Sequence, residues 1–136
     1  MPITVQWDNV EQTAVIIVYT RPWTWKDFDS AVEQMLSLFN SVHHQVDVIF
    51  DIRSAGFPPP DAITHFKKVA EIKHPNDGLL VYIAPNVLVQ FINGIVRILT
   101  VTFAGSNMFE TPKFVFTKSP EEARTYLLTH RGVKAS

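Results

Sequence analysis

Cysteine is absent from the 136 residues of this chain. Without a thiol, the protein has no disulfide, no zinc–thiolate site and no cysteine nucleophile. Glycine is scarce, with five residues, so few positions let the backbone approach a phosphate closely. None of these glycines belongs to a phosphate-binding loop, a dinucleotide-binding fingerprint or the Gly-x-Ser-x-Gly turn of a serine hydrolase. We therefore expect no enzymatic activity and no cofactor.

An excess of one charge is also missing. The formal net charge is −1, and the only adjacent lysines are Lys67 and Lys68. Nucleic-acid binding requires a positive surface, so we expect no nucleic-acid partner. The most apolar stretch, 87–103, is interrupted by polar residues and is slightly too short to span a membrane. The first residues carry no signal-peptide pattern. We therefore expect a cytoplasmic protein without stable membrane insertion.

The remaining composition is that of a globular protein. Apolar residues make up 46% of the chain and charged residues 18%, far from the composition of disordered segments. A chain of this length fits one domain and can bury its own core. We predict a single domain over residues 1–136.

Hydrophobic periodicity predicts five strands and four helices. Apolar and β-branched runs predict strands at 3–7, 13–19, 46–52, 79–84 and 113–117. Helical spacing and capping residues predict helices at 25–42, 60–72, 87–103 and 120–130. The short link between the first two strands predicts an antiparallel hairpin. The later strands alternate with helices, which predicts parallel pairing. The fold class is therefore α/β, with a mixed five-stranded sheet and four helices.

Three short segments carry a family resemblance. They are Arg21-Pro22-Trp23-Thr24-Trp25 before the first helix, Asp51-Ile52-Arg53 at the end of the third strand, and Ser119-Pro120-Glu121-Glu122-Ala123-Arg124 at the last helix. With the order of the elements, they resemble the STAS family, the fold of bacterial anti-sigma factor antagonists. The closest match within it is the SpoIIAA-like, or STAS/SEC14-type, subgroup. The resemblance implies a regulatory or binding module.

One departure from that family concerns its phosphorylated serine. Anti-sigma factor antagonists carry this serine in a compact turn that opens a helix, where the helix N-terminus stabilises phosphate. Here the corresponding stretch, 51–60, has Ser54 as its only serine, several residues before the predicted helix. The switch motif is absent as such, and phosphorylation of Ser54 is left open.

The end of the third strand is the candidate binding edge. Ligands of open α/β sheets bind at the carboxyl ends of the strands, which here are 51–57 and 84–86. The candidate residues for binding a ligand or partner are Asp51, Arg53, Ser54, Phe57, Trp23 and His65. Structural roles are the alternative: Asp51 caps the loop, and Trp23 packs as a hydrophobic staple. The five histidines lack metal-ligand spacing, so we expect no metal site.

The third predicted helix is more apolar than a surface helix requires. Its polar residues fall within an arc of roughly 80°, whereas a helix on a sheet needs an apolar stripe only somewhat over 100° wide. The surplus must be buried by neighbouring helices, a second subunit or an apolar ligand. The candidate dimer or apolar face consists of Ile92, Val96, Leu99 and Phe103.

These observations lead to two functional hypotheses. The first is a non-enzymatic STAS/SpoIIAA-like module that binds a protein partner or a small apolar ligand and forms a homodimer through the third helix. The alternative is a SEC14-like lipid- or acyl-binding protein with a cavity under that helix.

Overall fold

In the computed structural model of this protein, the described residues are 2–70, 74–102 and 115–135. The strands are β1 (Ile3–Trp7), β2 (Ala14–Thr20), β3 (Val46–Ser54), β4 (Asp77–Ile83) and β5 (Val115–Thr117). The helices are α1 (Trp25–Asn40), α2 (Ala62–Ala70), α3 (Asn86–Thr102) and α4 (Pro120–Ala135). The predicted order of elements is confirmed. Most boundaries agree within two residues, but α4 continues five residues past its predicted end at His130. The predicted end of α2 at Ile72, the predicted end of α3 at Phe103 and the predicted start of β5 at Lys113 lie outside the described residues.

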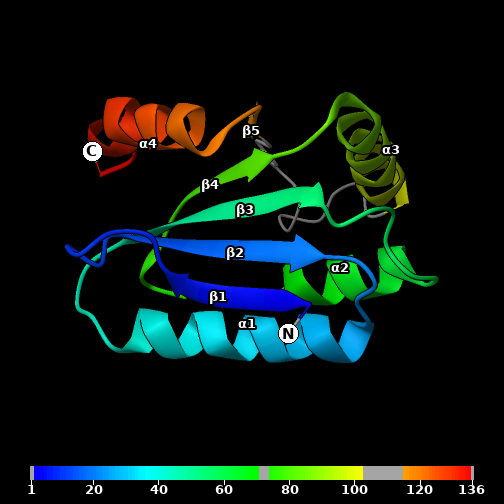
Figure 1. The fold of residues 1–136 in the computed structure, drawn as a ribbon, viewed down its shortest axis with the longest axis horizontal. Coiled ribbons are helices and arrows are strands. Elements are labelled where there is room, and N and C mark those ends of the chain that lie inside the picture. The colour runs from blue at the N-terminus through cyan, green and yellow to red at the C-terminus, as the bar shows by residue number, and fades with distance from the viewer. Residues whose placement is uncertain (1, 71–73, 103–114, 136) are drawn as a thin grey trace.

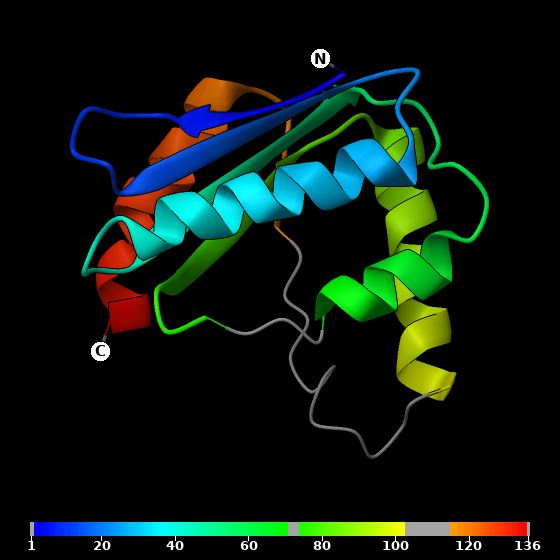
Figure 2. The ribbon, with the colours of Figure 1, turned by 90° about the horizontal axis from the view of Figure 1, so that it is seen from below.

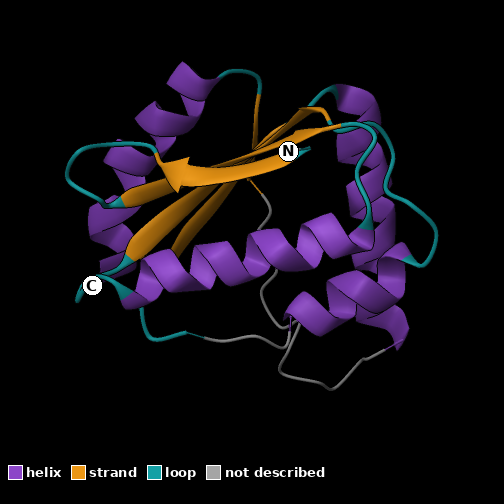
Figure 3. Cartoon of the chain, turned by 60° about the horizontal axis from the view of Figure 1, so that its bottom comes forward, coloured by secondary structure: helices purple, strands orange, loops and turns teal. Residues whose placement is uncertain are grey.

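The strands lie in the sheet in the order in which they occur in the chain, β1-β2-β3-β4-β5 (Figure 1). β1 is antiparallel to β2, and the three other pairs are parallel. This confirms the predicted mixed sheet. When right-handed crossovers advance in one direction, their helices fall on one side, and a helix after the last strand can cover the other. Accordingly, α1 and α2 lie on one side of the sheet and α4 on the other (Figures 1 and 3).

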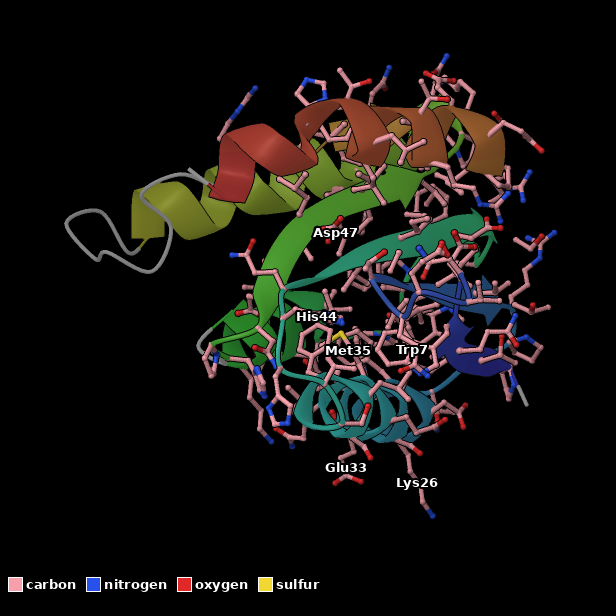
Figure 4. The ribbon with its side chains drawn as sticks, turned by 90° about the vertical axis from the view of Figure 1, so that its left-hand side faces the viewer. Trp7, Lys26, Glu33, Met35, His44 and Asp47 are labelled. Carbon is pink, nitrogen blue, oxygen red and sulfur yellow. The ribbon has the colours of Figure 1, made fainter. Side chains whose placement is uncertain are left out.

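Two apolar cores result, one on each face of the sheet. Successive side chains of a strand point to opposite faces. Val15, Ile17 and Val48 therefore pack toward α1, whereas Ile16, Ile49 and Val81 pack toward α4. Burial on both faces explains the continuous apolar runs of β2 and β3. Figure 4 shows that α1 also has a side that faces the sheet and a side that faces away: Met35 points toward the sheet, and Lys26 and Glu33 point away from it.

The sequence analysis treated the third helix as one that covers the sheet, but α3 does not lie over the sheet. It begins three residues after the end of β4, packs against α2 and extends beyond the carboxyl ends of β3 and β4 (Figures 1 and 2). Ile92 is half-buried there. The side chains of Val96 and Leu99, and all of Phe103, lie outside the described part of the structure. Among the described residues, no helix is long and apolar enough to cross a membrane.

Two polar contacts hold the ends of the sheet. The Leu79 N–H donates to Oδ1 of the buried Asp47, with an N–O distance of 2.8 Å, and fixes the start of β4 on β3. In α4, the Arg124 guanidinium binds the Asp8 carboxylate in the β1–β2 connection through N–O distances of 2.9 and 2.8 Å. The second contact joins residues near the two ends of the chain.

Candidate functional site

The carboxyl ends of β2, β3 and β4 meet at one edge of the sheet, and an open cavity of about 500 Å³ lies there. Its lining comes from the ends of β2 and β3, the loop after β3 and the start of α3: Thr20, Arg21, Arg53, Ser54, Gly56, Phe57, Pro85, Val87 and Leu88. This edge is the one that the sequence predicted. Arg53, Ser54 and Phe57 are the candidate residues that line the cavity.

Arg21 directly follows β2 and is held at the cavity by its backbone and by Gly56. Its N–H donates to the carbonyl of Ser54 at 3.0 Å, which joins the ends of β2 and β3. Its side chain lies across Gly56, since a Cβ at that position would be 3.2 Å from Arg21 Cδ. Gly56 also has a φ of 66°, which a residue with a side chain adopts at a cost. Glycine therefore makes room for the Arg21 side chain.

Asp51 and Arg53 form a two-bond ion pair beside the cavity. Arg53 Nε lies 2.9 Å from Asp51 Oδ1, and Arg53 Nη2 lies 2.7 Å from Asp51 Oδ2. The Asp51 side chain is 10% exposed and that of Arg53 47%. Hydrogen bonds from Arg53 lower the pKa of Asp51 although burial acts to raise it. Asp51 is therefore ionised at neutral pH, and it compensates the charge of Arg53.

Among the described residues, Arg21 has no such partner. Within the described residues, no carboxylate forms an ion pair with it, in contrast to Arg53 and Arg124. Its side chain is exposed. A third cation, Lys118 after β5, contacts Asn86 Oδ1 at the start of α3. Arg21 therefore contributes an uncompensated positive charge to the cavity wall.

Other side chains of the lining are large, apolar and open to solvent. Phe57 is 59% exposed and Val87 56%, whereas Leu88 is buried. Phe57 packs edge-on against Phe91 of α3, with ring centroids 5.2 Å apart. Large apolar side chains that stay this exposed mark sites of interaction when they lie together. The cavity lining thus combines cationic and apolar side chains.

Trp23 supports this edge from inside the protein. Its Nε1–H donates to the carbonyl of Ala55 at 3.0 Å, and its ring packs on Phe28 in the first turn of α1. This is the predicted hydrophobic staple. Trp23 is buried, and burial also raises the pKa of Tyr19, which packs edge-on against it. Trp23 does not line the cavity, so a binding role for it stays a prediction.

His65 lies apart from the ion pair. Its ring stacks on Trp25, with centroids 4.1 Å apart and planes 6° from parallel. The Trp25 Nε1–H donates to the carbonyl of Pro60 at 2.6 Å. These contacts fasten α2 to the start of α1. Of these candidate residues, the structure therefore brings Asp51 and Arg53 together, whereas His65 contacts Trp25 and not the ion pair.

The sequence did not single out Arg21 as a site residue. The sequence did contain a signal for it. Arg21 immediately follows β2, which is parallel to β3, so Arg21 lies at the same edge of the sheet as the end of β3. Val87 was similarly assigned only to the apolar helix. For metal ions, no group of three histidine or acidic side chains within the described residues is arranged to hold one.

Comparison with known proteins identifies the fold. No family model matches the sequence, and no curated protein is significantly similar to it. A similar crystal structure is that of an uncharacterized protein of the DUF3478 family from Shewanella loihica PV-4, described as having a SpoIIAA-like fold. The two structures align with a TM-score of 0.60 and 13% sequence identity, over 92% of this chain and 91% of the other. Similarity at this identity shows the fold, and this fold was the one predicted.

Proposed function

We propose that this chain, a protein of SpoIIAA-like fold, is a non-enzymatic binding module whose ligand occupies the cavity at the carboxyl edge of the sheet. The position of the cavity carries the proposal, because ligands of α/β sheets bind outside the carboxyl ends of the strands. Its volume of about 500 Å³ suits a small molecule, since such sites range over about 300–1,000 Å³.

The lining supports binding rather than catalysis. A catalytic hydroxyl needs a base within hydrogen-bond reach. Thr20 and Ser54 line the cavity, and neither hydroxyl has a histidine or carboxylate partner within the described part of the chain. Asp51 is engaged by Arg53, and His65 is stacked on Trp25.

A protein partner is the second candidate for the same surface. Phe57 and Val87 stand exposed at the mouth of the cavity, and exposed apolar side chains anchor protein interfaces. The SEC14-like alternative, a lipid or acyl ligand under α3, draws on the same apolar side chains, because Val87 and Leu88 are the second and third residues of α3.

Native mass spectrometry of the freshly purified protein tests the ligand-binding proposal. We expect a bound small molecule on the wild type. Ser54→Tyr places a ring in the cavity and is expected to abolish that extra mass. Ser37→Tyr, at an exposed position of α1, is the matched control and is expected to retain it. Equal ligand occupancy in the two variants would contradict the cavity as the binding site.

The homodimer is a separate prediction. We expect a wild-type dimer in size-exclusion chromatography with light scattering. Ile92→Glu is expected to yield a monomer, because the dimer contact would bury an unpaired charge. The neighbouring Asn93 is exposed, so Asn93→Glu adds the same charge and is expected to leave the dimer intact. A monomeric wild type would overturn this prediction.

A further inference from the structure

We infer that the cavity selects an amphipathic carboxylate, a small molecule whose carboxylate binds Arg21 and whose apolar body lies against Phe57 and Val87. This inference rests on the proposed function, because it names the ligand class of the same cavity. It goes further in assigning recognition to Arg21 and in fixing the charge of the ligand.

The charges at the cavity favour a monoanion. Asp51 compensates Arg53 through two hydrogen bonds, whereas no carboxylate in the described residues pairs with Arg21. The described lining holds two arginines and no carboxylate, so with Asp51 beside Arg53 the net charge of this group is +1. A doubly charged phosphate would need further donors, and Gly56 is the only glycine among the described lining residues that lets a backbone approach closely.

The guanidinium of Arg21 suits a carboxylate in geometry as well as charge. Its planar donors bind the two oxygens of a carboxylate in parallel. The Arg21 N–H is anchored on Ser54, and its side chain rests across Gly56, with Nη1 3.8 Å from where a Cβ would lie. A side chain held in this way loses less conformational freedom on binding.

The other lining residues offer contacts for both the polar head and the apolar body of the ligand. Thr20 and Ser54 line the same cavity as Arg21, and the hydroxyl of each can donate to a carboxylate oxygen. The apolar part of the lining consists of Phe57, Pro85, Val87 and Leu88. A lining that combines polar and cationic groups with apolar side chains matches an amphipathic molecule rather than a purely apolar one.

Isothermal titration with three probes of equal chain length tests this inference. Decanoate, decanamide and decyl phosphate present an anionic carboxylate, a neutral amide and a phosphate on the same apolar body. We expect decanoate to bind wild type at least about tenfold more tightly than decanamide, since a charge-assisted bond contributes about 1.5–3 kcal/mol. Decyl phosphate is expected to bind more weakly than decanoate.

Substitutions then assign the selectivity to Arg21. Arg21→Gln is expected to weaken decanoate binding by about tenfold to a hundredfold and to leave decanamide binding unchanged. Arg21→Lys keeps the charge and loses the planar fork, so its decanoate affinity is expected to be intermediate. Arg97→Gln removes an exposed arginine from α3 and is expected to match the wild type. Thermal melts confirm that each variant is folded.

The outcomes separate this inference from the proposed function. Equal affinities for decanoate and decanamide, both unaffected by Arg21→Gln, overturn the carboxylate assignment and leave a cavity for neutral apolar ligands. Tighter binding of decyl phosphate than of decanoate also overturns it. Absence of binding by all three probes overturns the amphipathic class, and the bound mass lost in Ser54→Tyr then decides whether the cavity binds another ligand.

Discussion

Asp47 is a buried carboxylate at the amino end of β3, and its partner is the backbone of β4. The strand can approach because residue 78 is glycine. A Cβ at Gly78 would meet Asp47 Oδ1 and would lie 2.7 Å from the carbonyl oxygen of Val46. The second contact is with backbone, which cannot rotate away as a flexible side chain can. Gly78 is therefore required by close approach between two strands.

We expect Gly78→Ala to lower the free energy of unfolding by about 1–3 kcal/mol, the usual cost of overpacking. Urea denaturation measures the change. Gly94→Ala is the control, because a Cβ there meets no atom of the described residues within 4 Å. In the middle of a helix, alanine is expected to stabilise by about 0.5–1 kcal/mol. Equal effects of the two substitutions would refute the close approach at Gly78.

The Asp51–Arg53 pair predicts a dependence of stability on pH. Arg53 lowers the pKa of Asp51 from its usual 3.8, so the pair stabilises the fold above that pH and loses its effect as pH falls through the lowered value. Because Arg53 is half-exposed, solvent screens the pair. Arg53→Gln is expected to cost about 1 kcal/mol at pH 7 and less at pH 3.

Urea denaturation of wild type and Arg53→Gln at the two pH values checks this prediction. Arg97→Gln removes an exposed arginine from α3 and serves as the control. A cost of Arg53→Gln that is the same at pH 3 as at pH 7 would argue against the ion pair as its source.

Single residues differ in how far the sequence reveals their roles. Asp51 and Arg53 are two positions apart in a strand, so period-two alternation puts them on one face and their pairing is foreseeable. That Arg21 has no ion-pair partner among the described residues could not be predicted in this way, because it depends on which carboxylates the whole fold brings near Arg21. The same holds for the stack of His65 on Trp25, which joins two helices.

At the scale of elements, the start of α1 is specified by adjacent residues. Thr24 accepts from the Asp27 N–H through its side chain, and the Asp27 carboxylate accepts from the Thr24 N–H, which completes a capping box. Trp23 packs against Phe28 across the same turn. These contacts are local, and for that reason the helix start is predictable from the sequence.

We expect Thr24→Ala to lower the free energy of unfolding by about 1 kcal/mol, because one helix N–H loses its acceptor. Thermal and urea denaturation measure the loss. Ser37→Ala, at an exposed position within α1, removes a hydroxyl without touching the cap and is expected to be neutral or slightly stabilising. A loss for Ser37→Ala as large as that for Thr24→Ala would mean that the cap is not the cause.

The position of α3 shows the opposite case. Its periodicity identifies a helix and its apolar excess, but periodicity carries no information on which element a helix contacts. The contact with α2 and the location beyond the strand ends arise from packing between distant segments. The same location brings Val87 and Leu88 to the cavity, and therefore a part of the candidate site was missed with it.

At the scale of the whole molecule, the ion pair of Asp8 with Arg124 joins the opening hairpin to the last helix. The Asp8 side chain is 7% exposed and that of Arg124 46%. We expect Arg124→Gln to destabilise the protein by about 1–2 kcal/mol, because the carboxylate keeps its burial and loses its charged partner. A double-mutant cycle with Asp8→Asn measures the coupling, and a coupling energy near zero would show that the two residues act independently.

The order of the sheet has a consequence for synthesis. Each strand after β1 pairs with the strand that precedes it in the chain. When a strand leaves the ribosome, the strand with which it pairs has therefore already been synthesised. Cotranslational folding can then proceed by addition, without inserting a late strand between two earlier ones. The uncovered edge is the aggregation-prone part of each nascent intermediate. After β5, α4 can dock, and Arg124 then binds Asp8.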